Sequence, residues 1–522
     1  MISISKLKSE TPVDAPREDR VGIFAPRTRT WLAVGVLVSA AFYRTLTFWA
    51  VNAWDLSSPT KILLVAMGLA VIGVGLWFLI AGAEGTKIPV ALGLGALTFL
   101  LMSWHRISVA FAIALALLLL AFIWIGRKAG TSALLDGTAV VAVVAIGVMP
   151  VAQLVMAHVT DAEAYPVVSL PDPVSATASG VVEDVLVVIV DSYPNLTLAK
   201  DWFDHDTMPL IDGLESHGFS VEPNAWSHHT FTSVSVPSIL ALQSVIEAGP
   251  IGSWENRSSL FRMTRGDNLV SRTLESAGFR YTHVESGWDG TECGPTVDRC
   301  VASPWIDDQV TLLLNPTVAG GWVQNRHPFY TGTLNAAGAL QKQLATLTSD
   351  GVHDYIFAHF LMPHDPLLAD AECAQTDHPG DLDQDKARRF AAVSAQMTCV
   401  DTLLTTTLEG LGPDTAVLLA GDHGTATGEQ AYRPAEEWSD ADIAERFGVL
   451  LAYRLPASCA GPSSPDPIVA MGAILTCALE EDFSPPPSEH LIGYEDPVEV
   501  DNDRLTRIKQ LVGSGQLLPD PD

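Results

Sequence analysis

The chain has 522 residues, with 30 basic and 60 acidic side chains and a formal net charge of −30 at pH 7. A chain of this length is too long to fold around one small hydrophobic core, so more than one structural unit is expected. The acidic balance excludes binding to nucleic acid or to an anionic membrane surface by general electrostatic attraction.

Long apolar runs dominate residues 1–160. Each run is close to the roughly 20 residues that a helix needs to cross a bilayer. A polar segment, residues 1–29, precedes them, and this order argues against a cleavable signal peptide. We therefore expect a transmembrane domain of five helices over residues 30–160, with apolar runs at residues 31–53, 61–81, 88–104, 107–126 and 137–158.

The placement of Lys and Arg predicts the orientation of these helices. Six basic residues lie in the N-terminal segment, and the links after the second and fourth runs carry Lys87, Arg127 and Lys128. The alternate links hold only Lys61 and Arg106. Basic residues favour the cytoplasmic side, so the N-terminus is predicted there. Five crossings then place the chain after about residue 160 outside the cytoplasm, as part of a multi-pass cell-membrane protein.

The second part of the chain differs in charge and in cysteine content. Residues 161–522 hold 18 of the basic and 53 of the acidic side chains, a net charge of −35. They also hold all six cysteines, and an even number in an exported domain indicates disulfides. Six cysteines allow fifteen pairings. Their order along the chain suggests the local pairs Cys293–Cys300, Cys373–Cys399 and Cys459–Cys477.

The composition divides this second part into three segments. Residues 161–180 are small and proline-containing without periodicity, and are expected to form a linker. Residues 181–480 alternate strand-like and helical patterns, which predicts an α/β domain with a mostly parallel sheet. Within it, residues 185–190 and 416–420 are continuous apolar runs, typical of strands buried on both faces. Residues 481–522 are rich in proline and acidic residues and are expected to form a C-terminal tail.

Both apolar runs lead to a carboxylate. Asp191 follows the first, and Asp422 and His423 follow the second, far along the sequence. Ligands of open α/β sheets bind at the carboxyl ends of the strands, so these side chains are candidates for one site. Two carboxylates and an imidazole suit one divalent cation, namely Mn, Zn or Mg, with Ca also possible.

A hydroxyl beside such a cation would be activated as a nucleophile. Thr232 lies where a helix is expected to begin, before Pro237, and is the candidate nucleophile and fourth metal ligand. The alternative is an ordinary helix-capping threonine. His364 is the candidate catalytic histidine, which orients the substrate or protonates the leaving group. His359 and Ser235 are the candidate substrate ligands, with a core histidine as the alternative for His359.

These segments resemble the alkaline phosphatase superfamily, specifically its sulfatase-like branch. Within that branch, the layout is similar to lipoteichoic acid synthases and lipid A phosphoethanolamine transferases. The resemblance implies five membrane helices, an exported α/β catalytic domain, an acidic ligand at a strand end and a nucleophilic Thr. It also implies a His-x-Pro histidine and an Asp-His-Gly. The matching positions here are Asp191, Thr232, His364 in PHDP, and Asp422-His423-Gly424.

The sequence departs from the family patterns in three places. Sulfatases carry Arg at the end of a C/S-x-P-x-R run, and Ile239 stands there after Ser235. Sulfatases usually also carry a pair of acids after the first strand, whereas Ser192 follows Asp191. The transferases typically show a further histidine soon after Asp-His-Gly. Residues 424–438 contain none, so the histidine set is incomplete or His490 completes it. His228 and His229 are expected on a surface loop.

The sequence therefore predicts a membrane-anchored, metal-dependent enzyme of the cell envelope. It would hydrolyse or transfer a phosphoryl-linked group of a membrane lipid or lipid-linked glycan through a covalent Thr232 intermediate. A sulfatase that cleaves sulfate esters is one alternative. A non-catalytic envelope binding protein with a degenerate site is the other. Nucleic acid is not an expected partner, and the sequence leaves the oligomeric state open.

Overall fold

The fold is taken from a computed structural model, which describes residues 24–53, 56, 59–81, 87–102, 132–159, 167–168, 172–249, 257–301, 305–324, 326–347, 351–376, 385–428, 433–493 and 496–516. The chain divides into two compact units. One contains Met1–Phe48 and Leu63–Leu154, and the other contains Trp49–Ile62 and Val155–Asp522.

The first unit is built from apolar helices. They are α1 (Pro26–Val51), α2 (Thr60–Ile80), α3 (Lys87–Leu101), α5 (Ser132–Val143) and α6 (Met149–Val159), with the π-helical turn η3 (Val144–Val148) joining the last two. Small residues such as Ala33, Ala91 and Ala139 have no exposed surface, so the helices approach closely there. Arg29 forms an ion pair with Asp136 at 3.0 Å, which satisfies both charges beside the apolar core.

Three helices in the described part of the chain are long and apolar enough to cross a membrane. They are Arg27–Val51, Thr60–Ile80 and Leu135–Val159, with mean hydropathies of 1.5, 2.6 and 2.4. The third predicted run forms α3, whose 15 residues are fewer than a full crossing requires. The fourth run, residues 107–126, lies outside the described residues. Five crossings therefore stay a prediction.

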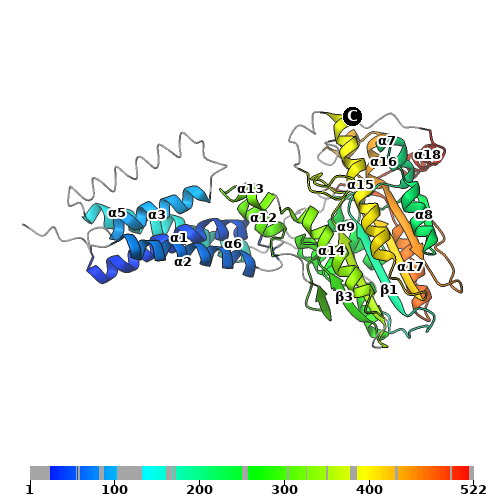
Figure 1. Cartoon of the computed structure of the whole chain (residues 1–522), viewed down its shortest axis with the longest axis horizontal. Coiled ribbons are helices and arrows are strands. Elements are labelled where there is room, and N and C mark those ends of the chain that lie inside the picture. Colours follow the sequence, from blue (N-terminus) through cyan, green and yellow to red (C-terminus); the bar gives the residue numbers. More distant parts are fainter. Residues whose placement is uncertain are drawn as a thin grey trace, which may run out of the picture. The chain divides into compact units, whose positions relative to one another are not determined.

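The second unit contains a mixed seven-stranded sheet in the order β2-β7-β6-β1-β5-β3-β4 (Figure 1). The strands β1, β3, β4, β5 and β6 run parallel, and β7 is antiparallel to both of its neighbours. This confirms the expected α/β class with a mostly parallel sheet. The strands are β1 (Asp184–Val190), β2 (Ser220–Trp226), β3 (Arg280–Val284), β4 (Arg299–Val301), β5 (Asp354–Phe360), β6 (Thr415–Gly421) and β7 (Gly448–Arg454).

Helices cover both faces of this sheet, which explains why β1, β5 and β6 are buried along their whole length. Alternate residues of β1 enter different cores. Leu186 and Val188 pack with the first set of helices, and Val187 and Ile189 with the second. The first set is α7 (Leu196–Phe203), α8 (Met208–Ser216), α14 (Pro328–Leu344) and α15 (Lys386–Leu408), and the second is α9 (Thr232–Ala241), α11 (Leu269–Ser276) and α17 (Pro467–Ala478).

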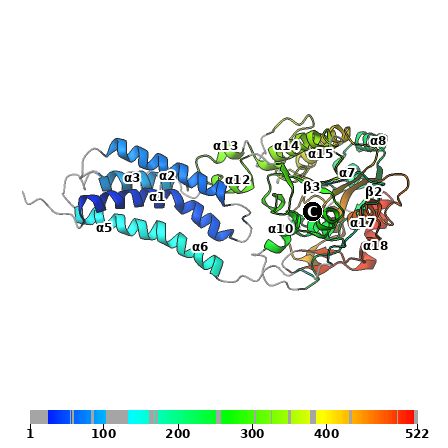
Figure 2. The same ribbon diagram turned by 90° about the horizontal axis from the view of Figure 1, so that it is seen from below.

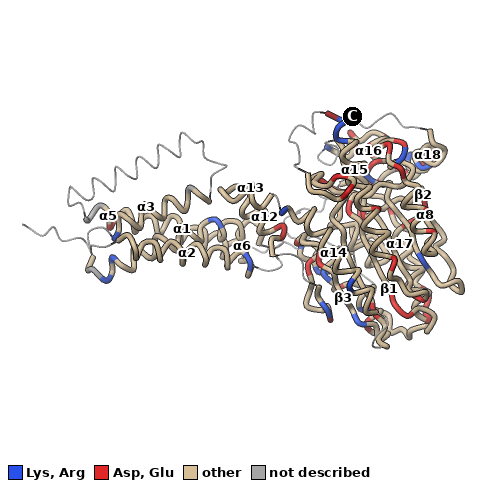
Figure 3. The backbone as a smooth tube through the Cα atoms, viewed as in Figure 1, with Lys and Arg blue, Asp and Glu red and all other residues tan. Residues whose placement is uncertain are grey.

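Shorter elements complete the second unit (Figure 2). They are α10 (Ser258–Thr264), η4 (Asp289–Thr291), α12 (Asp308–Leu314), α13 (Gly320–Gln324), η7 (Ala435–Glu437), α16 (Asp440–Phe447), β8 (Leu491–Ile492), β9 (Val498–Glu499) and α18 (Asn502–Gly513). Asp and Glu residues are spread over this unit, whereas the helices of the first unit contain few charged residues along their length (Figure 3).

Parts of the predicted linker and tail contact the α/β domain. In the linker, Ser179 N donates to Ala478 O at 2.9 Å. In the tail, Leu505, Ile508 and Val512 on one face of α18 share a core with Phe447. The apolar spacing along α18 explains this packing, because the three residues fall on one helical stripe. Residues 502–513 are therefore ordered by the domain despite their acidic surroundings.

The structure joins the cysteines in the three suggested local pairs, Cys293–Cys300, Cys373–Cys399 and Cys459–Cys477. The second pair ties the segment after β5 to α15. A disulfide limits the freedom of the unfolded chain more strongly when it closes a longer loop. The Cys373–Cys399 pair spans 26 positions and the Cys293–Cys300 pair spans 7.

We expect the double change Cys373→Ala and Cys399→Ala to lower the free energy of unfolding by about 3.5 kcal/mol, because of the loop-length dependence. Cys293→Ala with Cys300→Ala is the control and is expected to cost about 1 kcal/mol less. Thermal unfolding of the purified full chain measures both. An equal or reversed order of the two variants would contradict loop closure as the dominant effect.

Candidate active site

The pairing register brings two distant carboxylates to one edge of the sheet. Val190, the last residue of β1, pairs with Gly421, the last residue of β6. Asp191 and Asp422 are the next residues along their strands, so both leave the sheet at its carboxyl edge. This position follows from parallel pairing between strands of equal length. It is the edge at which α/β sheets bind ligands.

Both carboxylates are buried, and Ser192 holds them together. Asp191 is 3% exposed and Asp422 is fully buried. The Ser192 main-chain N donates to Asp422 Oδ1 at 3.1 Å, and its hydroxyl donates to Asp191 Oδ1 at 3.2 Å. Ser192 has a φ of 60°, a left-handed conformation that turns the chain sharply after β1. Ser192, which stands where sulfatases usually have the second acid of a pair, therefore links the two strand ends.

His423 brings an imidazole to the same place. Its Nδ1 lies 2.9 Å from Gly424 O. A carbonyl only accepts, so Nδ1 carries the hydrogen and Nε2 presents a lone pair. The Thr232 hydroxyl donates to this Nε2 at 3.0 Å. Burial lowers the pKa of His423 well below its ordinary value, and the Arg446 charge lowers it further. The imidazole is therefore neutral at neutral pH.

The donor set fits a divalent cation. One atom each from Asp191, Asp422 and His423 lies within 4.8 Å of the others. Asp422 Oδ2 is buried without a hydrogen-bond partner, and its distance to His423 Nε2 is 3.5 Å. Burial raises the pKa of Asp191 well above its ordinary value, and the neighbouring Asp422 raises it further. A cation would offset both the desolvation and the repulsion of this pair.

His359 lies beside the carboxylates but has no exposed surface. Its Nε2 is buried without a hydrogen-bond partner, 3.8 Å from Asp191 Oδ2. Its Nδ1 lies 3.3 Å from the Thr291 hydroxyl. Burial lowers the pKa of His359 to about 4, so the side chain is neutral at neutral pH. The structure thus places His359 against Asp191, and its role as a substrate ligand stays a prediction.

A chain of hydrogen bonds supports His359 from behind. Thr291 O accepts from His283 Nε2 at 2.8 Å, and His283 Nδ1 accepts from the Tyr281 hydroxyl at 2.9 Å. Tyr281 and His283 belong to β3, and both are fully buried. Neither residue was predicted to belong to the site. Their only sequence signal is the alternation of polar and aromatic side chains in a short strand.

His364 is half-buried and lies near His423, with the two ring centres 6.2 Å apart. Its Nδ1 donates to Asp365 O at 2.5 Å, which leaves Nε2 as the acceptor nitrogen. Burial lowers the pKa of His364, so it is neutral at neutral pH. Arg389 of α15 pairs with the Asp365 carboxylate and donates to Ala426 O at 3.2 Å. Arg389 therefore links the loops after β5 and β6.

Ser235 and Arg446 hold the main chain around the site. The Ser235 hydroxyl donates to Asp422 O at 2.5 Å, and Ser235 is 2% exposed. Arg446 of α16 donates to Gly424 O at 2.9 Å and also to Thr230 O. One guanidinium thus bridges the loop that carries Thr232 and the loop that carries His423. Sequence reasoning missed Arg446, because nothing in the sequence shows which carbonyls α16 faces.

The expectation that His228 and His229 lie on a surface loop is wrong. They are 6% and 2% exposed. His228 pairs with Asp466, and His229 Nε2 lies 3.1 Å from Ser244 Oγ. The residues lie between β2 and α9, where the chain passes through the interior to reach the site. The His490 ring packs at a tilt against the His228 ring, with the ring centres 4.4 Å apart. The suggestion that His490 completes the histidine set stays a prediction.

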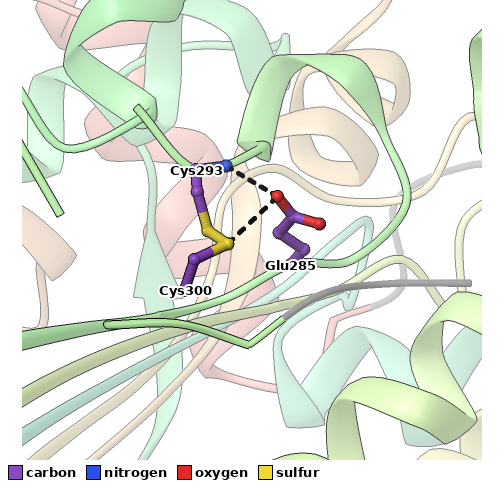
Figure 4. Close-up of side chains that lie close together, drawn as sticks. All are labelled: Glu285, Cys293 and Cys300. Carbon is purple, nitrogen blue, oxygen red and sulfur yellow. Dashed lines mark hydrogen bonds between the residues drawn. A yellow bond between two sulfur atoms is a disulfide. The ribbon is translucent and has the colours of Figure 1, made fainter. Parts of the chain in front are cut away.

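A second group of possible ligands has a different explanation. Glu285, Cys293 and Cys300 lie close together, but the two cysteines form a disulfide (Figure 4). Disulfide sulfurs are not thiolates and do not offer the charge that metals bind. The Glu285 carboxylate instead accepts from Cys293 N at 3.1 Å, as Figure 4 shows. This group therefore fixes a turn between β3 and β4.

The family model described as Sulfatase matches residues 183–451. No curated protein sequence matches the chain. Similar solved structures include the integral membrane protein lipooligosaccharide phosphoethanolamine transferase A from Neisseria meningitidis. That protein is 14% identical, with a TM-score of 0.38 and coverage of 81% of this chain and 88% of the other.

Two further structures are similar at the same low level. The C-terminal periplasmic domain of EcEptC from Escherichia coli, in complex with Zn, is 12% identical with a TM-score of 0.40. The similarity covers 65% of this chain and 97% of the other. The lipoteichoic acid synthase LtaP from Listeria monocytogenes is 13% identical with a TM-score of 0.36. Here the similarity covers 67% of this chain and 95% of the other.

The buried His283 predicts sensitivity to acid. Burial lowers its pKa to about 4, whereas the unfolded chain takes up this proton near pH 6.5. Stability is therefore expected to fall as the pH drops from about 6.5 towards 4. In His283→Gln, the loss of melting temperature between pH 7 and pH 4.5 should be smaller than in the wild type. His217→Gln, at the end of α8, is the control and should follow the wild type. A wild-type acid response in His283→Gln would refute this assignment.

Proposed function

Because the chain belongs to the sulfatase family, we propose that it is a membrane-anchored, metal-dependent hydrolase or transferase. Its substrate would be a phosphoryl-linked group of an envelope lipid or lipid-linked glycan. One observation carries this proposal: the Thr232 hydroxyl lies 3.0 Å from His423 Nε2, beside the buried carboxylates of Asp191 and Asp422. A hydroxyl in such a place can be deprotonated and aimed at an electrophile.

In this proposal Asp191, Asp422, His423 and Thr232 hold one divalent cation. Carboxylate oxygens and an imidazole suit Zn and Mn, and the oxygens alone suit Mg or Ca. When bound, the cation lowers the pKa of the hydroxyl and neutralises charge on the transferred group. The unpartnered Asp422 Oδ2 and the close packing of two carboxylates support this assignment.

The reaction would proceed in two balanced steps. In the first, Thr232 Oγ1 forms a bond to phosphorus and the bond from phosphorus to the leaving oxygen breaks. The hydroxyl proton of Thr232 passes to solvent, because His423 Nε2 would bind the cation, and the leaving oxygen takes a proton from solvent. In the second, water or an acceptor hydroxyl attacks phosphorus and the bond to Thr232 breaks. Water as the acceptor gives hydrolysis, and an alcohol gives transfer.

The surrounding residues support these steps. Thr232 is the first residue of α9, whose positive dipole end favours an anionic phosphoryl group. His364 presents its acceptor nitrogen near His423 and would take the proton of the second nucleophile and pass it to the departing Thr232 oxygen. His359 would contact Asp191 and help to position its carboxylate, rather than contact the substrate.

The membrane part supports a lipid-borne substrate. Three apolar helices exceed what anchoring requires, and an enzyme fixed at a bilayer meets lipids at high local concentration. The orientation predicted from Lys and Arg would place the α/β domain outside the cytoplasm. Disulfides in that domain agree with an oxidising compartment. A sulfate ester is a weaker candidate, because the Ser235 hydroxyl is already bonded to Asp422 O.

We expect Thr232→Ala to reduce the release of nitrophenol from bis(4-nitrophenyl) phosphate on the order of 10³-fold or more, because it removes the nucleophile. Thr232→Ser keeps a hydroxyl and should retain measurable turnover. Trapping with the same substrate, followed by peptide mass spectrometry, should place a phosphoryl adduct on Thr232. Full activity in Thr232→Ala would refute the nucleophile, and preferential hydrolysis of 4-nitrophenyl sulfate would favour the sulfatase alternative.

Metal content gives an independent test. Elemental mass spectrometry of the purified full chain should find close to one Zn, Mn, Mg or Ca ion per chain. Asp422→Asn should reduce this occupancy strongly, because it removes a charged ligand. Asp401→Asn is the matched control, since Asp401 is also buried but bonds to Tyr193 and His205. A wild-type protein that binds none of these ions would support the non-catalytic alternative.

A further inference from the structure

In residues 305–323, large apolar side chains are exposed and an acidic side chain is buried, which is the opposite of the usual pattern in a segment that faces water. These residues contain α12 and α13, two short helices that pack against each other. Their exposed side chains are apolar: Trp305 is 50% exposed, Leu312 49%, Val318 55% and Trp322 51%. The acidic Asp307 is instead only 1% exposed. We call residues 305–323 the apolar segment.

This segment contrasts with the rest of its unit. Residues 161–522 carry a net charge of −35, yet α13 contains no charged residue (Figure 3). Within residues 172–516, as far as the structure describes them, the exposed tryptophans are Trp305 and Trp322. Clustered exposed apolar side chains of this size mark an interaction surface. A strongly acidic, soluble domain would otherwise gain nothing by presenting two tryptophans to water.

The buried acid ties the segment to the start of an apolar helix. Asp307 Oδ1 caps α12 by accepting from Val310 N at 2.8 Å, and its other oxygen pairs with the Lys61 ammonium. Lys61 also lies 3.6 Å from Glu292 Oε1. It is the second residue of α2, which is long and apolar enough to span a membrane. The ion pair therefore connects α12 to the residue where a candidate membrane span begins.

The division of the chain into two compact units agrees with this contact between α12 and Lys61. The compact unit that contains the apolar segment also contains the end of α1, the start of α2 and the end of α6, residues 49–51, 60–62 and 155–159. These are ends of the three candidate membrane spans. The boundary between bilayer and water must lie close to such helix ends, because polar backbone beyond them requires solvent.

We propose that the apolar segment docks into the interface of the bilayer that holds the helices. Tryptophan is enriched at this level, because its ring is apolar and its N–H is polar. The Arg326 guanidinium, 4.7 Å from the Trp322 ring centre, would lie among the lipid phosphates. The Lys61–Asp307 pair fixes the height of the segment. Docking would hold the α/β domain at the membrane surface, whatever reaction the domain performs.

Site-directed spin labelling of the full chain in nanodiscs of phosphatidylcholine and phosphatidylglycerol tests this docking. The native cysteines are paired in disulfides, so an added cysteine is the one labelled. Leu312→Cys and Val318→Cys report on the apolar segment. Val352→Cys and Met208→Cys are controls of comparable exposure, 40% and 53%, elsewhere in the same unit.

Docking predicts that labels at 312 and 318 collide several-fold more often with oxygen than with a water-soluble nickel complex. Labels at 352 and 208 should show the opposite order. Equal access to the nickel complex at all four positions would overturn the proposal. Shielding of 312 and 318 from both reagents would also overturn it, because protein rather than lipid would then cover the segment. Unchanged thermal unfolding of each variant ensures that the labels report on the folded chain.

Discussion

The structure depends on the parallel pairing of β1 with β5 and with β6. This pairing brings two carboxylates together at a buried strand end, although nothing in the local chain favours their approach. Like charges in a desolvated place repel and resist ionisation. The fold tolerates them because Ser192 donates to both, and because the Arg446 charge lies nearby and lowers the pKa of Asp191. A bound cation would complete this balance.

The loops around the carboxylates depend on the same arrangement. Arg446 bonds the carbonyls of Thr230 and Gly424, and Arg389 joins the loops after β5 and β6. These contacts fix main chain rather than substrate groups, so they position Thr232, His364 and His423 relative to each other. Catalysis by positioned groups is sensitive to small displacements. The two arginines would therefore support the proposed chemistry by positioning these groups.

The second unit combines a rigid base for the candidate active site with an exposed apolar segment. Its core strands are sealed between two helix layers, which gives the site a rigid base. Its apolar segment faces outward and is tied to Lys61, where an apolar helix begins. The proposed reaction on an envelope lipid would use both features, because the reacting group would lie at a fixed depth while the chemistry needs a pre-organised site. The acidic residues in the rest of the unit favour its solubility in water.

Sequence patterns by themselves determined the class of the fold and the strand ends at which the candidate site residues lie. Continuous apolar runs require burial on both faces, so β1 and β6 could be predicted, together with Asp191 and Asp422 at their ends. The order of the cysteines similarly predicted the local disulfide pairs, and the apolar runs predicted the apolar helices. These properties rest on short-range periodicity, which one sequence records directly.

Tertiary structure alone decided which side chains meet. His228 and His229 looked like polar loop residues, yet the path from β2 to α9 buries them. Ser235 is predicted as a substrate ligand, and only the folded structure shows that its hydroxyl donates to Asp422 O. Arg446, Thr291 and His283 gave no sequence signal, because their roles depend on partners from other elements. Such contacts follow from the register of a sheet and the rotation of helices upon it, which residue spacing does not specify.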